Sequence, residues 1–135
     1  MPERTPAIVA DTSAIMAILY GEPEAAKMRQ ALHGAKSALI SAANVLELQL
    51  VIAGARSRTG WQHAADLLRQ YNIAIHPFDE RQLHLAREAA LKYGKGRHKA
   101  KLNFGDCFAY ALAKSEGVPL LCTGRDFAHT DLEMA

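Results

Sequence analysis

The stretch that decides the fold is residues 8–13, which read Ile8-Val9-Ala10-Asp11-Thr12-Ser13. Three apolar residues bounded by an acid are typical of a short strand that is buried on both faces. Asp11 or Ser13 can cap a following helix, and the apolar run over residues 14–20, which Gly21 ends, is expected to be that helix. A buried strand that leads directly into a helix is the repeating unit of a parallel α/β sheet.

The same alternation continues along the chain. Further strands are expected at residues 38–40, 73–75 and 120–122, with one last strand near Leu132. Helices are expected at residues 23–32, 42–53, 61–71, 80–93 and 105–116, and residues 94–103 are expected to form a basic loop. Ser41 is the expected cap of the third of these six helices, counting the one over residues 14–20. The pattern predicts an α/β domain with a parallel sheet covered on both faces.

Composition narrows the class of protein. With 135 residues the chain fits one compact domain, which we expect to span residues 1–135. Half of the residues are hydrophobic and 22% are charged, which is typical of a folded protein and not of a disordered one. The net charge of +2 is too small to imply a polyanionic partner by itself.

No apolar stretch reaches the ~18 residues that a membrane span requires, and the N-terminus lacks the pattern of an export signal. The two cysteines, Cys107 and Cys122, lie within apolar runs, as reduced and buried thiols do. We therefore expect a cytoplasmic protein without a membrane partner.

Four acidic residues fall where the carboxyl ends of the strands are expected. Asp11 follows the first strand, Glu47 lies in the helix after the second, Asp106 opens a helix after the basic loop, and Asp126 follows the fourth strand. Ligands of parallel α/β sheets bind at this edge, so the four carboxylates can reach one site. Each also has a purely structural explanation: Asp11 as a helix cap, Asp106 as an acid favoured by the helix dipole, and Asp126 as a turn residue.

Glu47 stands out because its neighbours along the helix are almost all apolar. An acid in such a helix needs either a solvent-facing stripe or a partner. Asn44 lies three residues earlier on the same face and can orient the carboxylate. The alternative is that Asn44 and Glu47 form an ordinary polar stripe.

Several carboxylates that lie close together repel one another, and this raises their pKa values unless a cation is present. A hard divalent ion with oxygen ligands resolves the repulsion, and Mg²⁺ or Mn²⁺ suits such a set. Ions of this kind support phosphodiester hydrolysis. Zinc suits the chain less well, because its six histidines and two cysteines show no metal-ligand spacing.

A run of cations without any acid leads into Asp106: Lys92, Lys95, Arg97, Lys99 and Lys101. Such a run beside an acidic metal site suits a phosphate backbone, although a solvated surface is the commoner explanation. Tyr93 and Phe104 flank it and could stack on bases or belong to the core.

The chain resembles the PIN-domain ribonucleases, and within them the VapC-like toxins of bacterial toxin–antitoxin pairs. Four segments in register carry the resemblance: residues 8–14 (IVADTSA), 41–47 (SAANVLE), 102–113 (LNFGDCFAYALA) and 120–127 (LLCTGRDF). The family's fold is three-layer α/β/α with a five-stranded, mainly parallel sheet. The resemblance therefore implies this fold for the chain, together with Mg²⁺- or Mn²⁺-dependent RNA cleavage. It also implies a homodimer that a cognate VapB-like antitoxin inhibits in a higher assembly.

Matched by position, the resemblance implies that Asp11, Glu47 and Asp106 hold the metal and that Asp126 is the family's more variable fourth acid. It also implies that the family's two supporting hydroxyl residues are Ser13 and Thr123. Arg125 stands where many relatives carry asparagine, and an arginine there could alter substrate contact or pair with an acid.

Two other functions were weighed against this one. A PIN-like module that binds RNA or protein without cutting is disfavoured, because a degenerate copy should have lost one of the acids. A phosphate-binding or phospho-accepting α/β regulator is also disfavoured, because the chain lacks a glycine-rich phosphate loop. Such a regulator would also have no need of Glu47 and Asp106.

Overall fold

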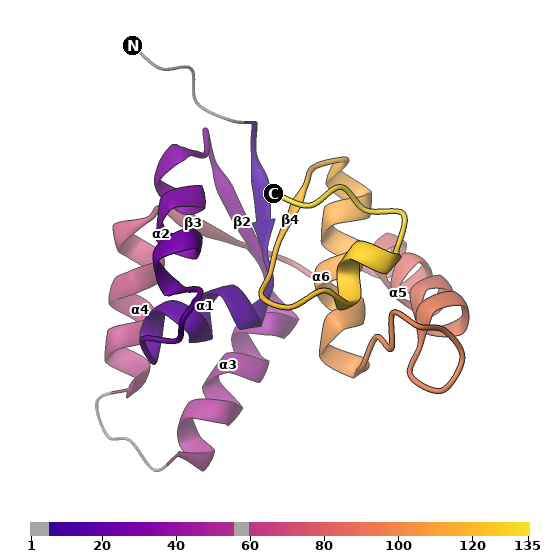
Figure 1. Ribbon diagram of the computed structural model, residues 1–135, viewed down its shortest axis with the longest axis horizontal. Helices are drawn as coiled ribbons and strands as arrows, with labels where there is room; N and C mark the ends of the chain where they lie inside the picture. Colours follow the sequence, from indigo (N-terminus) through magenta and orange to yellow (C-terminus); the bar gives the residue numbers. More distant parts are fainter. Residues whose placement is uncertain (1–5, 56–59) are drawn as a thin grey trace.

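The computed structural model describes residues 6–55 and 60–135 (Figure 1). Part of the expectation about an export signal concerns residues 1–5, which lie outside this range. The four strands are β1 (Ile8–Ala10), β2 (Ala38–Ser41), β3 (Ile73–His76) and β4 (Leu120–Leu121). The helices are α1 (Thr12–Leu19), α2 (Ala25–Gly34), α3 (Ala42–Gly54), α4 (Gly60–Gln70), α5 (Glu80–Tyr93) and α6 (Phe104–Glu116), followed by the 3₁₀ helix η1 (Asp126–His129). None of the described helices is long and apolar enough to cross a membrane.

All strands of the sheet run parallel, in the order β3-β2-β1-β4. Helices α1, α2 and α4 cover one face, and α5 and α6 cover the other (Figure 1). Because side chains alternate along a strand, Ile8 and Ala10 of β1 pack into the first core while Val9 packs into the second. The expected three-layer α/β/α architecture is therefore confirmed, with the apolar strand β1 buried between two cores.

Among residues 6–55 and 60–135 the sheet has four strands, where the resemblance implied five. The tail does reach the sheet, but only through a single parallel bridge between Leu120 and Met134. Two backbone hydrogen bonds of 2.9 Å hold it there, from Leu120 N–H to the Glu133 carbonyl and from Ala135 N–H to the Leu120 carbonyl. One bridged pair is too short to form a strand, so the strand expected near Leu132 is replaced by an extended contact at Met134.

Helix boundaries differ from the expected ones by a few residues, for local reasons. Helix α1 begins at Thr12 because Asp11 caps it, and α6 begins at Phe104 because Asn103 caps it. The 3₁₀ helix η1 was not predicted, and a single turn of this kind leaves no periodic pattern in a sequence.

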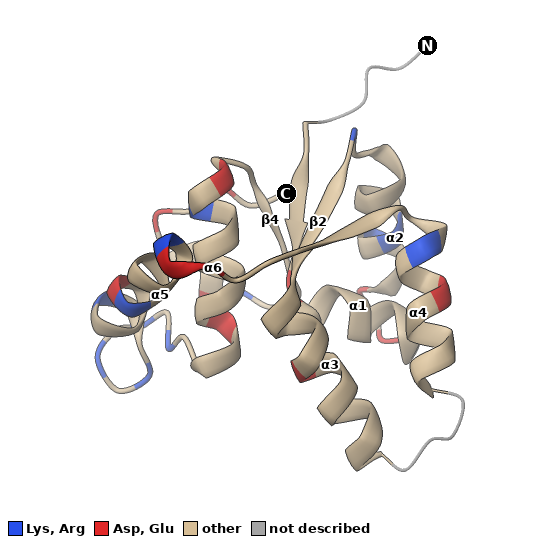
Figure 2. Cartoon of the chain, turned by 180° about the vertical axis from the view of Figure 1, so that it is seen from behind, with Lys and Arg blue, Asp and Glu red and all other residues tan. Residues whose placement is uncertain are grey.

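The basic segment over residues 94–103 is held in place by backbone bonds. Lys95 N–H donates to the Leu102 carbonyl at 3.0 Å, and Leu102 N–H donates to the Tyr93 carbonyl at 2.9 Å. Ala100 and Leu102 are buried beneath the segment. Its exposed lysine and arginine residues are therefore carried on a fixed backbone between α5 and α6, where Figure 2 colours them blue.

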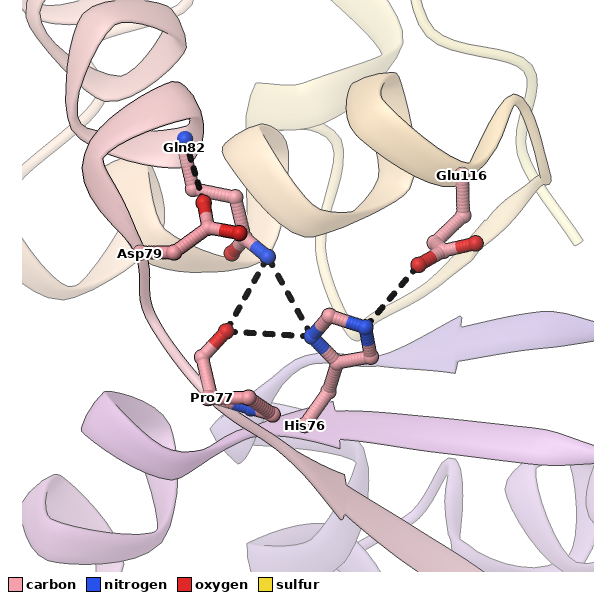
Figure 3. Close-up of polar contacts among 5 residues, drawn as sticks. All are labelled: His76, Pro77, Asp79, Gln82 and Glu116. Carbon is pink, nitrogen blue, oxygen red and sulfur yellow. Dashed lines mark hydrogen bonds and ion pairs between the residues drawn. The ribbon is translucent and has the colours of Figure 1, made fainter.

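A polar junction fastens the end of β3 to α5 and α6 (Figure 3). The His76 Nε2 atom lies 3.0 Å from Glu116 Oε1, and His76 Nδ1 lies 3.0 Å from the Pro77 carbonyl oxygen. Gln82, which is 1% exposed, donates its amide to the same Pro77 carbonyl at 3.1 Å. Proline offers no backbone N–H to the sheet, so the Gln82 amide is what ties this turn to α5.

Replacing Gln82 with alanine should remove the bond to Pro77 and leave a small buried cavity. We expect the free energy of unfolding to fall by about 2–3 kcal/mol, measured by urea denaturation. The control is Gln62→Ala, because the Gln62 amide also makes a hydrogen bond, to Asp66 at 3.0 Å, but is exposed. A loss that is no larger for Gln82 than for Gln62 would contradict the role given to the junction.

Candidate active site

Asp11 lies at the carboxyl end of the central strand β1. Its backbone N–H donates to the Leu121 carbonyl at 2.9 Å, and its Oδ2 atom accepts a hydrogen bond from Ser13 N–H at 3.1 Å. Asp11 therefore does cap helix α1, which is the structural role that the sequence allowed for it. Its side chain is also 4% exposed, which a cap does not need, because cap residues at surfaces remain solvated.

Glu47 reaches the same place from the second turn of α3. Its Oε1 atom accepts from the Thr12 hydroxyl at 2.6 Å and from the Asn44 side-chain amide at 3.2 Å. Asn44 is fully buried and also donates to the Gly105 carbonyl at 3.0 Å. The predicted orientation of Glu47 by Asn44 is thus present, and the two residues do not form a solvent-facing stripe.

Gly105 provides the space for the Glu47 carboxylate. A Cβ atom built on Gly105 would meet Glu47 Oε2 at 1.9 Å, and real Cβ atoms essentially never approach another atom below 3.0 Å. Any side chain at this position would therefore displace the acid. The glycine is needed for close approach between α3 and α6 and not for an unusual backbone conformation.

Asp106 lies in the first turn of α6 and forms a capping box with Asn103. Its Oδ2 atom accepts from Asn103 N–H at 2.9 Å, while its own N–H donates to Asn103 Oδ1 at 2.9 Å. The structural explanation weighed for Asp106 thus holds in part, since the acid does serve the helix terminus. The Oδ1 atom of Asp106 has no hydrogen-bond partner among the described residues and remains available.

The segment after β4 is joined to α1 through a hydroxyl. Thr123 N–H donates to the Ser13 Oγ atom at 3.1 Å, so the two predicted supporting residues do come together. Asp126 begins η1 and is exposed, yet its negative charge contributes to raising the pKa of Asp106, so it lies near that acid. Arg125 is exposed as well and forms no ion pair within the described part of the chain.

The carboxylates perturb one another. Burial raises the pKa of Asp11 from 3.8 to about 6; hydrogen bonds from Ser13 oppose the rise, and the charges of Asp106 and Glu47 add to it. Burial also raises the pKa of Asp106, again with the charges of Glu47 and Asp126 contributing. Burial and the charges of Asp11 and Asp106 raise the pKa of the neighbouring Cys122 thiol to about 12. Within the described ranges no lysine or arginine forms an ion pair with any of these acids.

These features fit a hard divalent cation by donor chemistry. The candidate donors are carboxylate oxygens, and Glu47 and Asp106 each keep one oxygen without a hydrogen-bond partner among the described residues. Uncompensated negative charge at a buried position is what such an ion would relieve. In residues 6–55 and 60–135, however, no three acidic, histidine or cysteine side chains are gathered tightly enough to share one ion in this conformation.

The cations of the basic segment stand apart from the acids. Lys95, Arg97, Lys99 and Lys101 are all exposed, and Lys95 lines an apolar groove together with Asn103 and Phe104. Of the two flanking aromatic residues, Tyr93 is buried in the core, whereas Phe104 is 84% exposed. The segment thus leads into the terminus of α6 that carries Asp106, and within the described residues its lysine and arginine side chains form no ion pair with the carboxylates.

Two residues of the site were not singled out from the sequence. The sequence pattern places Thr12 in the stretch that can cap the first helix and Gly105 at the start of a later helix, and it indicates no further role for either. Their contacts with Glu47 span 35 and 58 positions of the chain, so no local pattern could reveal them.

The raised pKa of Asp11 gives a test of its burial. An acid whose folded-state pKa is raised from 3.8 to about 6 stabilises the folded state below pH 3.8 and loses that contribution as the pH rises through 6. Without metal, Asp11→Asn should therefore be more stable than the wild type at pH 8, by up to about 3 kcal/mol, with the difference vanishing near pH 4.

Chemical denaturation in chelator-containing buffers from pH 4 to pH 8 measures this difference. The control is Asp66→Asn, because the exposed Asp66 carboxyl has a lowered pKa, so its removal should not stabilise the protein at pH 8. An Asp11→Asn variant that is less stable than the wild type at pH 8 would rule out an uncompensated buried charge.

Comparison with known proteins shows the family to which the chain belongs. The PIN domain family model matches residues 8–133. The Mycobacterium tuberculosis protein named Ribonuclease VapC30 is 44% identical over 133 residues, covering 93% of this chain and 95% of that protein. Ribonuclease VapC of Mycolicibacterium smegmatis is 42% identical over 125 residues, covering 93% and 97%.

Solved structures with the same fold include toxins of this kind. The crystal structure of Mycobacterium tuberculosis VapC20, a sarcin-ricin loop cleaving toxin, superposes with a TM-score of 0.76 at 14% identity, covering 95% of this chain and 98% of that one. VapBC2 from Rickettsia felis, bound to a DNA fragment from its promoter, gives a TM-score of 0.67 at 15% identity, covering 96% and 97%. At such identities these structures show the fold, and together with the family match and the closer sequence relatives they lead to one conclusion: the chain belongs to the PIN domain family, in the group of VapC ribonucleases.

Proposed function

We propose that this protein is a divalent-metal-dependent endoribonuclease that acts as the toxin of a toxin–antitoxin pair. The observation that carries the proposal is the set of mutually repelling carboxylates of Asp11, Glu47 and Asp106 at the carboxyl edge of the sheet, with no lysine or arginine paired to them in the described residues. The relatives at 42–44% identity carry the name ribonuclease, which supports RNA as the substrate.

Asp11, Glu47 and Asp106 are the residues that would hold Mg²⁺ or Mn²⁺, with the exposed Asp126 completing or orienting the shell. A bound ion supplies Lewis-acid stabilisation of the phosphodiester and of the attacking water. The chain itself supplies the positioning: Ser13 supports Asp11 and is joined to Thr123, while Asn44 fixes Glu47. Burial of Asp11 restricts solvent around the reacting groups and strengthens their electrostatic interactions.

The exposed cations Lys95, Arg97, Lys99 and Lys101 are proposed to bind the RNA backbone. They lie on a segment whose backbone is fixed, so the backbone needs little ordering when RNA binds. They also lead into the terminus of α6 that carries Asp106, which would place phosphate groups beside the acids.

Apolar surface beside the acids supports a protein partner. Leu46 and Leu50 of α3 are 55% and 64% exposed, and with Val51 and Phe104 they line a groove that also contains Glu47. Large apolar side chains grouped on a surface are typical of interaction sites. Together with the fold shared with a VapBC assembly, this supports a VapB-like antitoxin as partner.

We further propose that the protein is a single domain that forms a homodimer and a higher assembly with the antitoxin. We also propose a cytoplasmic location.

Removing either Asp11 or Asp106 should abolish cleavage. We expect Asp11→Asn and Asp106→Asn each to reduce the rate of RNA cleavage in Mg²⁺ or Mn²⁺ by at least about 100-fold, because each removes a charged oxygen donor. The measurement is the rate at which new RNA ends form, with thermal unfolding as the check on folding. Asp66→Asn is the control; cleavage that persists in either site variant would refute the assignment, and metal binding without any turnover in the wild type would favour a non-cutting module.

Neutralising the basic segment should weaken RNA binding and leave the chemical step largely intact. For Lys95, Arg97, Lys99 and Lys101 changed together to glutamine, we expect KM to rise about tenfold or more, kcat to change little, and the salt dependence of binding to become shallower. The control changes four exposed cations elsewhere on the surface, Lys27, Arg29, Lys36 and Arg69, to glutamine. An equal effect of both sets would mean that net charge, and not this segment, attracts the RNA.

A further inference from the structure

The hydroxyl of Thr12 is placed to control the position of Glu47. Thr12 is the first residue of α1, is 4% exposed, and directly follows Asp11. Its Oγ1 atom lies 2.6 Å from Glu47 Oε1 and 3.3 Å from the Asn44 carbonyl oxygen. A hydroxyl has a single proton to donate, and we assign this proton to the shorter contact, with the Glu47 carboxylate.

This contact leaves the two oxygens of Glu47 in different situations. Oε1 accepts from both Thr12 and Asn44, which belong to different helices. Oε2 accepts no hydrogen bond from the described residues and lies against Gly105, whose neighbour is Asp106. The hydrogen bonds therefore hold one oxygen and leave the other beside Gly105, close enough to Asp106 for the charge of Glu47 to act on that acid.

Thr12 suits this task better than a residue with more freedom. Its position is fixed on one side by Asp11, whose backbone is bonded into the sheet, and its β-branched side chain has few rotamers in a helix. Glutamate, by contrast, has three flexible side-chain torsions and loses considerable entropy when it is held in one conformation. A buried, stiff donor can hold the flexible acid in place before any ligand binds.

We propose that Thr12 is a positioning residue, which holds the Glu47 carboxylate so that its free oxygen Oε2 is presented beside Asp106 for a divalent ion. The inference rests on the proposed function, because it assigns Glu47 to the metal site. It adds a residue whose own atoms would touch neither the metal nor the RNA. Residues that hydrogen-bond to metal ligands typically change metal affinity 10–100-fold when they are removed.

The test compares variants that differ by one hydroxyl. Thr12→Val removes the donor at nearly constant shape, and Thr12→Ser keeps it. Thermal unfolding of the whole protein is measured over a range of Mn²⁺ concentrations, and the half-saturating concentration is obtained from the dependence of stability on free Mn²⁺, because the unfolding temperature itself does not plateau. We expect this concentration to rise about tenfold or more for Thr12→Val and to stay within about threefold for Thr12→Ser. Thr12→Ala, which adds no apolar bulk, should match Thr12→Val if the latter folds poorly.

Tyr110→Phe is the matched control. The Tyr110 hydroxyl also donates to a carboxylate, that of Asp131 at 2.7 Å, but at a junction between α6 and the tail that contains none of the candidate metal ligands. Its loss should lower the unfolding temperature without Mn²⁺ and leave the half-saturating Mn²⁺ concentration unchanged. A purely structural role for Thr12 would give the same result as this control.

A double-variant comparison tests whether Thr12 acts through Glu47. In a Glu47→Gln background, adding Thr12→Val should change the half-saturating Mn²⁺ concentration by less than about twofold, because the shared contact is already altered. A wild type that Mn²⁺ does not stabilise would overturn the metal site and this inference with it. If Thr12→Val binds Mn²⁺ with the wild-type half-saturating concentration, or if its effect adds fully to that of Glu47→Gln, the metal site stands and only the role given to Thr12 is overturned.

Discussion

A carboxylate fixed at the end of a central, buried strand is the constraint on which the rest of the structure depends. Asp11 follows β1, which has β2 on one side and β4 on the other, and its own N–H is bonded to Leu121. Its backbone is held in the sheet and its side chain is buried, and this burial raises its pKa to about 6. At neutral pH the folded chain therefore holds an ionised acid at an energetic cost, which a structural role alone does not explain.

The surrounding elements are built to bring further negative charge to this point. Gly105 lacks a side chain where α6 meets Glu47, and Asn44 bonds both to that acid and to the Gly105 carbonyl. Asp106 is oriented by the capping box that also starts α6, so one set of hydrogen bonds begins the helix and places the acid. These arrangements bring negatively charged carboxylates close together. Such a cluster is stable only where a bound cation or bound protons compensate the negative charge. The same edge of the molecule carries the basic segment and the apolar groove beside α3, where RNA and a partner protein would compete.

Much of this could be predicted from the sequence because the relevant signals are local. Apolar triplets mark the strands, and parallel strands place their carboxyl ends at one edge, so Asp11, Glu47 and Asp106 could be assigned to one site. The hydroxyl of Thr12 and the missing Cβ of Gly105 act across the fold and have no local signature. The last strand, expected near Leu132, was wrong because the apolar residues of the tail form only a single bridge, at Met134, and a sequence pattern does not distinguish one bridged pair from a strand. The exposure of Asp126 likewise depends on the turn that precedes η1, which periodicity does not describe.

The central claim is that these acids form a divalent-cation site whose negative charge is uncompensated in the free protein. Calorimetric titration of Mn²⁺ at pH 6, in buffers of different ionisation enthalpy, tests it most directly because it counts the protons released on binding. With the pKa of Asp11 at about 6, roughly half of this carboxyl is protonated at that pH, so binding should release about half a proton per site, falling toward zero at pH 8. Binding without proton release at pH 6, or no binding at all, would contradict the account.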